Sequence, residues 1–327
     1  AYQAQQHVQQ YNQIKNDIAM LGSFGASPTK AILSQIERDQ IVTTPQSFDS
    51  PWGANELLAP LGTPFALDIL NVVDYVTDAG AKNPTIGLIY QNDEAGADSV
   101  RGYEAARSAY GFDDAGQEPF KPGDTDFTAQ VQRMKSQGAD VVYIQALPGP
   151  AASIIGAGAT LGFTPQWVLT GPAFVENLMT KDGVAGSAPT PIAAALDGVL
   201  VTMFAAPWGD PAVPGMEQML ADQAEYAPDQ PPSVYFTFGY AQAKVQAAIL
   251  AKAIADGDLS REGILAAKTS LGDVDLQGLV PDVTYGGEAD FPSRASLIQA
   301  IDAAQPGFLR TVEPSFMGTA AKSYRLE

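Results

Sequence analysis

Short apolar runs rich in β-branched residues alternate with helical patterns along this chain, and this alternation constrains the fold more than any other feature. Apolar residues between the runs recur every three or four positions, as in Phe127, Val131 and Met134, which predicts helices. Runs that are apolar throughout and alternate with helices favour parallel sheets covered on both faces. We therefore predict an α/β fold of the doubly wound type, with strands at 18–21, 41–44, 85–90, 140–146, 166–170 and 198–205.

The length of the chain, 327 residues, suits two lobes better than one core. Two polar segments that contain glycine and proline, 78–85 and 206–216, separate one pattern from the next. Segments of this kind are where a chain passes between lobes. Crossings there give an N-terminal lobe of residues 1–80 and 208–290 and a C-terminal lobe of residues 81–207 and 291–327.

Charge and the scarcity of reactive side chains argue against several classes of function. The chain holds 18 Lys and Arg against 37 Asp and Glu, a formal net charge of -19, which argues against a nucleic-acid partner. The absence of cysteine excludes disulfides, thiolate metal sites and cysteine nucleophiles. The one histidine, His7, is expected away from every strand end, in a first helix with Val8, Tyr11 and Ile14 on one face. We therefore expect no catalytic triad, no metal site and no cofactor.

The residues just after the predicted strands form the expected binding surface, because ligands of such sheets bind beyond the carboxyl ends of the strands. These segments are rich in glycine, serine, proline and amide side chains, contain no histidine and carry few charges. This composition indicates binding rather than catalytic machinery. The segments are 22–29, 45–49, 91–96, 146–150 and 171–176.

The stretch GSFGASPTK, residues 22–30, leaves the first predicted strand and enters a helix. Gly22 and Gly25 lack the spacing of a phosphate-binding P-loop. Ser27 suits the N-cap of the helix, and Pro28 suits its first position. A helix N-terminus also offers free N–H groups and the positive end of a dipole to a carboxylate. Capping and carboxylate binding are compatible, since one hydroxyl cannot satisfy every free amide.

The stretch GAGATLG, residues 156–162, is similar to a dinucleotide-binding fingerprint, with Glu176 as the following acid. The preceding strand ends near Ala146, however, too early for that motif. Residues 151–161 therefore predict a helix of small residues that ends at Gly162, and no nicotinamide cofactor is expected.

The stretch YQNDEAGAD, residues 90–98, clusters three carboxylates, those of Asp93, Glu94 and Asp98. Such a cluster could hold calcium or supply an acid and a base. Because the spacing of an EF-hand is absent, we interpret it as a solvated loop that caps the next helix.

Five stretches follow one another in an order that a known family shares: VQQYNQIKNDIAMLGSFGASPTKAILSQIERDQIVTTPQSF, IGLIYQNDEAGADSVRGYEAA, TDFTAQVQRMKSQGADVVYI, ATLGFTPQWVLTGPAF and FGYAQAKVQAAILAKAI. Their order and spacing resemble the type I periplasmic solute-binding proteins, in particular the Leu/Ile/Val-binding branch of ABC importers. The resemblance implies two Rossmann-like lobes with parallel sheets, joined by a three-stranded hinge, with a solute in the cleft between them. It also implies that the first strand, helix and strand of lobe 1 are missing from this chain.

The resemblance further implies a periplasmic or otherwise extracytoplasmic protein that acts as a monomer. Its partners would be a small-molecule solute and the membrane permease of an ABC importer. Family members carry a signal peptide, and often a lipid-anchored cysteine, ahead of the point where this chain begins, so lipid anchoring stays open.

The ligand-binding positions follow from the resemblance residue by residue. In the family, the solute carboxylate is held by a serine and backbone N–H groups at the loop that corresponds to Gly25, Ala26 and Ser27. A second loop, here Gln46, Ser47 and Phe48, supplies small residues and a hydroxyl. The remaining expected positions are Phe24, Asn92, Glu94, Ala95, Ala146, Leu147, Ala173, Phe174 and Tyr235.

Two positions depart from the family pattern. Ala173 stands where amino-acid binders place the acid that pairs with the α-ammonium group, and Ala95 replaces an aromatic residue. An ammonium group desolvated without a partner costs several kcal/mol, although Glu94 or Glu176 could compensate. The expected solute is therefore a small carboxylate-bearing molecule, either similar to a branched-chain amino acid or an apolar or aromatic acid or amide.

We therefore expect a solute receptor and not an enzyme. One alternative is the ligand-sensing domain of a signalling receptor, since the same lobes occur there. The other is an enzyme on a doubly wound sheet that uses Asp93 and Glu94.

Overall fold

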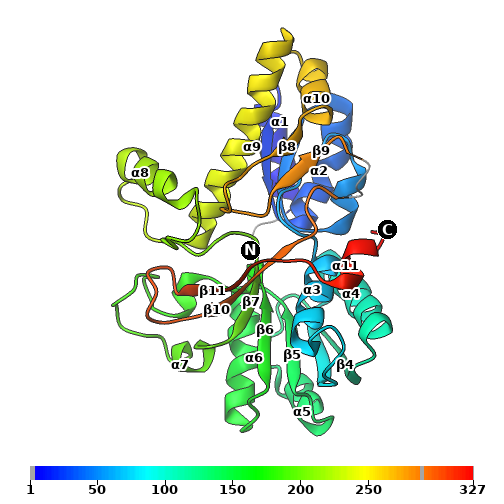
Figure 1. The fold of residues 1–327 in the computed structure, drawn as a ribbon, viewed down its shortest axis with the longest axis vertical. Helices are drawn as coiled ribbons and strands as arrows, with labels where there is room; N and C mark the ends of the chain where they lie inside the picture. Colours follow the sequence, from blue (N-terminus) through cyan, green and yellow to red (C-terminus); the bar gives the residue numbers. More distant parts are fainter. Residues whose placement is uncertain (1–3, 288–290, 327) are drawn as a thin grey trace.

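The computed structural model describes residues 4–287 and 291–326. Its elements gather into an upper and a lower group, here called the upper lobe and the lower lobe (Figure 1). The chain passes between the groups after β2, between β7 and α9, and between β9 and β10.

The upper lobe is built on a short parallel sheet in which β1 pairs with β2, with Leu21 opposite Thr43. The hairpin of β8 and β9 is antiparallel. Helix α8 lies to the side, on the segment that joins β7 to α9 (Figure 1). The elements are α1 (Ala4–Ile14), β1 (Leu21–Phe24), α2 (Ala26–Asp39), β2 (Thr43–Gln46), α8 (Met216–Tyr226), α9 (Val234–Asp256), α10 (Arg261–Thr269), β8 (Gly272–Val274) and β9 (Val283–Tyr285).

The lower lobe holds a seven-stranded sheet in the order β11-β10-β7-β6-β5-β3-β4. The strands from β7 to β4 are parallel, whereas β10 runs antiparallel to both of its neighbours. The strands are β3 (Thr85–Gln91), β4 (Asp113–Phe120), β5 (Val141–Gln145), β6 (Gln166–Thr170), β7 (Leu200–Met203), β10 (Ser296–Ile301) and β11 (Leu309–Phe316). The helices are α3 (Phe65–Thr77), α4 (Glu94–Tyr110), α5 (Thr128–Ser136), α6 (Pro148–Thr160), α7 (Ala193–Leu196) and α11 (Thr319–Ser323), with short 3-10 turns η1 (Ser50–Ala54), η2 (Gly171–Ala173) and η3 (Glu176–Leu178).

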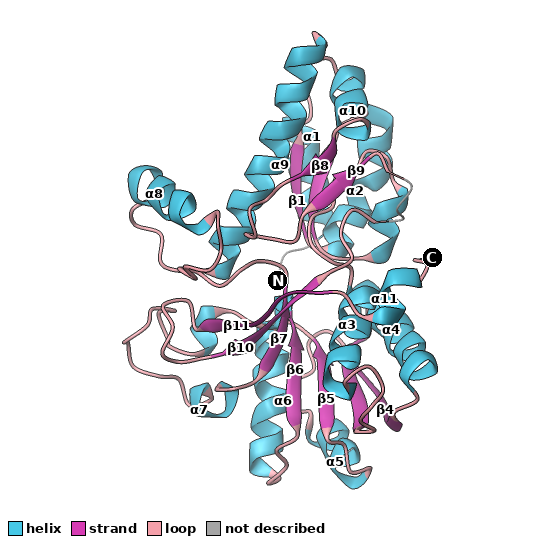
Figure 2. Cartoon of the chain, in the orientation of Figure 1, coloured by secondary structure: helices cyan, strands magenta, loops and turns pink. Residues whose placement is uncertain are grey.

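Helices cover both faces of the large sheet (Figure 2). Val141 and Tyr143 of β5 pack in the cluster that contains α3 and α4, while Val142 and Ile144 pack in the cluster that contains α5 and α6. Because successive side chains of a strand point to opposite faces, an apolar strand suits a sheet that is buried on both sides. The prediction of a doubly wound α/β fold is confirmed.

Helix α3 packs against α4 and β10 and lies with the lower sheet. The sequence-based prediction placed this helix in the N-terminal lobe, whose first segment it ended at residue 80. The structure thus groups residues 65–77 with the lower sheet, and the exact division of the chain into lobes stays a prediction.

Several local predictions differ from the structure. The first strand begins at Leu21 rather than at residue 18, and β4, β8, β9, β10 and β11 were not predicted. Strand β4 has the sequence DDAGQEPF, with no β-branched residue, and is held by its pairing with β3. In α1, Ile14 is 41% exposed, and His7 is buried with its Nε2 atom 2.9 Å from the Ser23 hydroxyl of β1. The placement of His7 away from the strands was therefore wrong.

Candidate functional site

Direct hydrogen bonds join the two lobes at their boundary, between the starts of α2 and α9 and the segments that follow β3 and β6. From the upper lobe, the Ser27 hydroxyl of α2 donates to Glu94 Oε2 of α4 (3.0 Å). The Tyr235 hydroxyl of α9 donates to the carbonyl oxygen of Phe174 (2.8 Å). The Val234 N–H, at the start of α9, donates to Glu176 Oε1 (3.1 Å). These contacts bring several of the expected site residues together from distant parts of the chain.

An aromatic cluster fills the centre of this boundary. Phe204, just after β7, stacks on Phe48 of the upper lobe with ring centroids 5.0 Å apart. Its ring also lies 4.9 Å from that of Phe238 and 5.4 Å from that of Tyr235, both on α9. Phe65 of α3 meets the edge of Phe48 at 5.8 Å. Sequence reasoning missed Phe204, Phe238 and Phe65, although Phe204 lies at the end of a predicted strand.

Glycines leave the space that these rings occupy. A Cβ on Gly62 would lie 2.6 Å from the Phe48 ring, and a Cβ on Gly171 would lie 2.6 Å from the Phe204 ring. Gly62 also has a φ of 91°, which side-chain-bearing residues rarely adopt. The backbone at both positions is therefore suited to close packing of the aromatic cluster.

Amide and hydroxyl groups lie beside the cluster. The Gln46 amide donates to Gln242 Oε1 of α9, and Gln242 Nε2 donates to the Thr44 hydroxyl (2.7 Å). The Ser47 hydroxyl accepts the indole N–H of Trp52 (2.8 Å). Gln242 was not among the expected site residues, because it lies in the middle of a helix.

The GSFGASPTK stretch folds differently from the prediction at its helix start. Gly25, not Ser27, is the N-cap of α2, with a φ of 87°. The Thr29 N–H donates to the Gly25 carbonyl (3.1 Å), so Pro28 falls in the first turn, where its missing N–H costs nothing. Ser27 lies one residue inside the helix, and its hydroxyl turns outward to Glu94.

The acidic stretch 93–98 caps α4 as predicted, but it is not a solvated loop, because only Asp93 precedes the helix and Glu94 and Asp98 lie in its first turns. Asp93 is the N-cap of α4 and accepts the Gly96 N–H (3.0 Å). Asp98 is completely buried, accepts the backbone N–H of Ser50, and pairs with Arg101 (2.6 Å). This carboxylate therefore joins α4 to the loop after β2.

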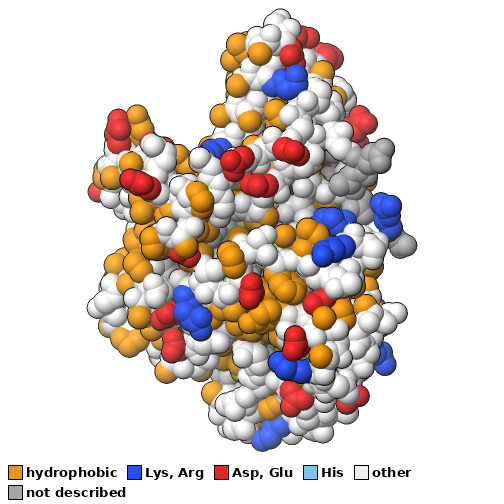
Figure 3. All heavy atoms as spheres, in the orientation of Figure 1, with side chains coloured by type: hydrophobic (Ala, Val, Ile, Leu, Met, Phe, Trp, Pro, Cys, Tyr) orange, Lys and Arg blue, Asp and Glu red, His pale blue; other side chains and the backbone are white. Residues whose placement is uncertain are grey.

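The other expected site residues differ in exposure. Phe24 and Leu147 are apolar but 59% and 55% exposed, at strand ends of opposite lobes. Figure 3 shows hydrophobic side chains gathered along the lobe boundary on one face of the molecule. The remaining residues divide by burial: Ala146, Ala173 and Phe174 are buried, Gly25, Ala26 and Ala95 are half-buried, and Asn92 is exposed.

Burial raises the pKa of Glu176, because desolvation disfavours its charged form more than its hydrogen bonds favour it. The Glu176 backbone N–H, followed by the Ser233 hydroxyl and the Val234 N–H, favours the charged form. Tyr143 of β5 is buried within the sheet with its hydroxyl near Thr202. It belongs to the core of the lower lobe and not to the lobe boundary.

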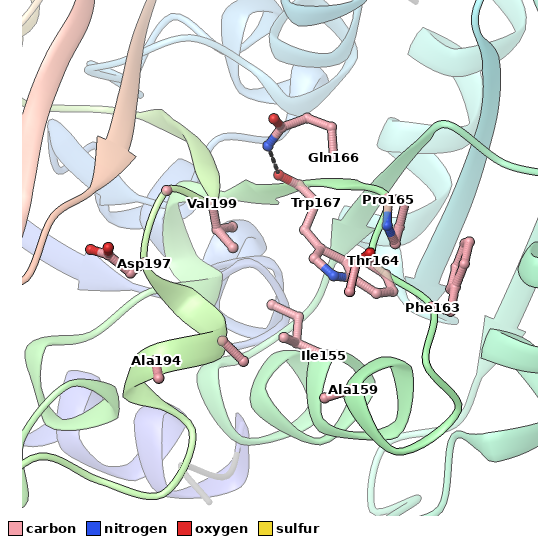
Figure 4. Close-up of a pocket in the computed structure, with 12 residues that line it drawn as sticks. Ile155, Ala159, Phe163, Thr164, Pro165, Gln166, Trp167, Ala194, Asp197 and Val199 are labelled. Atoms are coloured by element: carbon pink, nitrogen blue, oxygen red, sulfur yellow. Dashed lines mark hydrogen bonds between the residues drawn. The ribbon is translucent and has the colours of Figure 1, made fainter.

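A separate pocket of about 310 Å³ lies between α6, α7 and the starts of β6 and β7 (Figure 4). Ile155, Phe163 and Trp167 line it, and Gln166 Nε2 donates to the Trp167 carbonyl at its edge (2.9 Å). None of the expected site residues lines this pocket. It lies at the amino ends of the strands, opposite the ends where ligands of such sheets bind.

Within residues 4–287 and 291–326, no three His, Cys, Asp or Glu side chains are grouped so as to hold a metal ion. A search of the helices in the same described segments found none with the length and apolarity needed to cross a bilayer.

Comparison with known proteins identifies the family. A family model described as periplasmic binding protein matches residues 1–306. A search of curated protein sequences found no match. Among solved structures, a fatty acid ABC transporter substrate-binding protein from Thermomonospora curvata has a TM-score of 0.89 at 24% identity, covering 100% of this chain and 82% of that one.

Two further structures extend the comparison. A branched-chain amino acid ABC transporter protein from Thermus thermophilus with bound valine has a TM-score of 0.80 at 16% identity, covering 98% of this chain and 84% of that one. A leucine-binding protein from Thermotoga maritima has a TM-score of 0.76 at 15% identity, covering 97% and 85%. Because these identities are at most 24%, the solved structures support the fold alone. The match to the family model supports membership of the family. The chain belongs to the periplasmic binding protein family.

Proposed function

We propose that this protein is the extracytoplasmic solute-binding component of an ABC importer, and that it holds an apolar carboxylic acid between its two lobes. The aromatic cluster at the lobe boundary carries this proposal: the rings of Phe48, Phe65, Phe204 and Phe238 are 3–6% exposed as the lobes lie here, and they would form an apolar wall next to a helix N-terminus once the lobes separate. The Gly25 N–H donates to the Gln46 carbonyl (3.2 Å), which ties that N-terminus to the loop carrying Phe48. Similarity to a protein named for fatty acids supports the same class of solute.

The carboxylate end of the solute is assigned to the start of α2. Among the described residues, no hydrogen-bond acceptor is paired with the backbone N–H groups of Ala26 and Ser27. Free N–H groups at a helix N-terminus attract anions, and the Ser27 hydroxyl adds a third donor. The Ser47 hydroxyl, on the neighbouring loop, is a fourth.

The apolar part of the solute is assigned to the aromatic cluster. Burying apolar surface is worth about 25 cal/mol per Å², so aromatic walls favour a hydrocarbon body. An α-ammonium group lacks a carboxylate at the expected position, because residue 173 is a buried alanine, and the Glu176 carboxylate already accepts the Val234 N–H. These contacts favour a fatty or aromatic acid over an α-amino acid.

Neither alternative function gains support from a specific contact. An enzyme would need Asp93 and Glu94 as acid and base, yet Asp93 caps α4 and Glu94 pairs with Ser27 and Lys30. A signalling receptor would use the same lobes in the same way, so that alternative differs only in its downstream partner.

Thermal unfolding with a panel of solutes tests the proposal. We expect octanoate and phenylacetate to stabilise the protein, by about 2.7 kcal/mol at one hundred times the dissociation constant. Valine should stabilise it less, since its ammonium group would lose water without gaining a partner. Small-angle X-ray scattering should show a more compact particle with the bound acid, because a solute that contacts both lobes favours closure.

A matched pair of serine variants tests the carboxylate position. Ser27→Ala should weaken octanoate binding roughly tenfold, the usual effect of losing one hydrogen bond to a charged group. Ser108→Ala, an exposed position on α4, should leave the affinity unchanged. Binding of valine without binding of the acids would refute the proposed solute class.

A further inference from the structure

The side chain of Glu94 crosses the lobe boundary and places a carboxylate at the start of α2. Glu94 is the first residue of α4 in the lower lobe. Its Oε2 atom accepts the Ser27 hydroxyl at 3.0 Å, and its Oε1 atom lies 3.2 Å from Lys30 Nζ. Ser27 and Lys30 lie on the first turns of α2, in the upper lobe. A carboxylate of the protein itself therefore engages the Ser27 hydroxyl, one of the donors assigned above to the carboxylate of the solute.

The Ser27 hydroxyl cannot serve both carboxylates. A serine hydroxyl carries one proton and donates one hydrogen bond, so Ser27 bonds either to Glu94 or to a solute. Two carboxylates at one site also repel each other, and each raises the free energy of the other's charged form. The Glu94 backbone N–H, followed by Lys30 and Ser27, lowers the pKa of this carboxyl, so it is charged at neutral pH.

We propose that Glu94 is an internal competitor for the solute carboxylate, which the solute displaces from Ser27 and Lys30 when it binds. This inference rests on the proposed function. Glu94 is then a specificity-determining residue. Only a ligand with a carboxylate can take over the contacts with Ser27 and Lys30 that Glu94 loses when it is displaced. A neutral ligand with the same hydrocarbon body leaves Glu94 in place and gains nothing from its removal.

The contact is weak enough to be displaced. The side chains of Lys30 and Glu94 are 61% and 42% exposed, so water and salt screen the pair. A competing state of this strength reduces the apparent affinity of a ligand roughly fivefold, since binding must first release the contact. Removal of Glu94 frees both the Ser27 hydroxyl and the Lys30 ammonium group.

Calorimetric titration of octanoate and octanamide into the wild-type protein, Glu94→Ala and Glu94→Gln tests the inference. We expect octanoate to bind roughly fivefold more tightly to both variants, while octanamide binds all three proteins equally. Glu104→Gln is the matched control, because it removes one negative charge from an exposed position of the same helix. It should change octanoate affinity far less than Glu94→Gln.

The outcomes separate the two proposals. If the wild-type protein binds octanoate and the Glu94 variants bind it equally or more weakly, the inference is overturned while the proposed function stands. Equal gains for Glu94→Gln and Glu104→Gln would also overturn it, because a general charge effect would then explain the result. If neither the wild-type protein nor any variant binds a carboxylic acid, the proposed solute class fails and the inference fails with it.

Discussion

Replacing Phe204 with alanine is expected to lower the free energy of unfolding by about 3–5 kcal/mol, the range for removing a buried phenylalanine ring. Phe204 is 6% exposed and contacts the rings of Phe48, Phe238 and Tyr235. The three partners belong to the upper lobe, whereas Phe204 follows β7 of the lower lobe. The substitution therefore opens a cavity at the lobe boundary and weakens the contact between the lobes.

Urea unfolding, followed by circular dichroism and tryptophan fluorescence, measures this effect. Loss of coupling between the lobes should separate the transition into two steps, because each lobe would then unfold on its own. Tyr226→Ala removes an aromatic ring that is 77% exposed, and should change stability by less than about 0.5 kcal/mol. Equal stability of the Phe204→Ala and Tyr226→Ala proteins would show that the cluster does not hold the lobes together.

Replacing Asp49 with asparagine is expected to stabilise the protein at pH 8 and to remove part of its pH dependence. Burial, and to a smaller extent the charge of Asp98, raises the pKa of Asp49 from 3.8 to about 7. The nearby Ser47 hydroxyl and Trp52 side chain offset little of this, because no hydrogen bond of normal geometry reaches either carboxylate oxygen. Arg101 pairs with Asp98, whereas no ion pair is found for Asp49 among the described residues.

The sign of the effect follows from proton linkage. Between pH 4 and pH 7 the folded state binds more protons at Asp49 than the unfolded state, so stability falls as the pH rises through this range. A tenfold change in a protonation equilibrium is worth about 1.4 kcal/mol, so moving this pKa from 3.8 to about 7 corresponds to about 4 kcal/mol. Above pH 7 the wild-type protein bears the full free-energy cost of a buried, charged Asp49. The asparagine variant carries no charge there and avoids this cost.

Urea titrations at pH values from 4 to 8 compare Asp49→Asn with the wild-type protein and with Asp17→Asn. Asp17 is exposed, so the control removes a carboxylate without removing a buried charge. The difference between Asp49→Asn and the wild type should be small at pH 4 and should grow up to pH 7. A difference that does not vary with pH would refute a buried, charged Asp49.

Local signals predicted the elements whose ends are decided by their own residues. Gly162 ends α6 in the left-handed conformation, with a φ of 61°, because glycine adopts this conformation without strain. Asp93 caps α4 through a bond to an amide three residues away. The alternation between the apolar runs of strands and the three-to-four-residue spacing of helices likewise predicted the doubly wound sheet. This pattern can be read from the sequence because it depends only on residues that are neighbours along the chain.

Elements held by distant partners were missed. Strand β10 pairs with β7, almost one hundred residues earlier in the chain, and β11 joins the large sheet only through β10. The burial of Asp49 and Asp98 was also missed, because their sequence environment is that of polar loops. Such strand pairing and burial depend on which surfaces meet in the folded chain, and this cannot be predicted from short stretches of sequence.

The sequence by itself determined the alternation of strands and helices, the family to which the chain belongs, and the strand-end loops from which a binding site could be built. Only the tertiary structure decided that Ser27 meets Glu94, 67 positions away, and that Gln46 meets Gln242, 196 positions away. It also decided that Phe204 and Phe238 close the lobe boundary around Phe48. The physical reason is that periodicity and capping act within a few residues, whereas a site between lobes is made by packing surfaces that are adjacent only after the chain has folded.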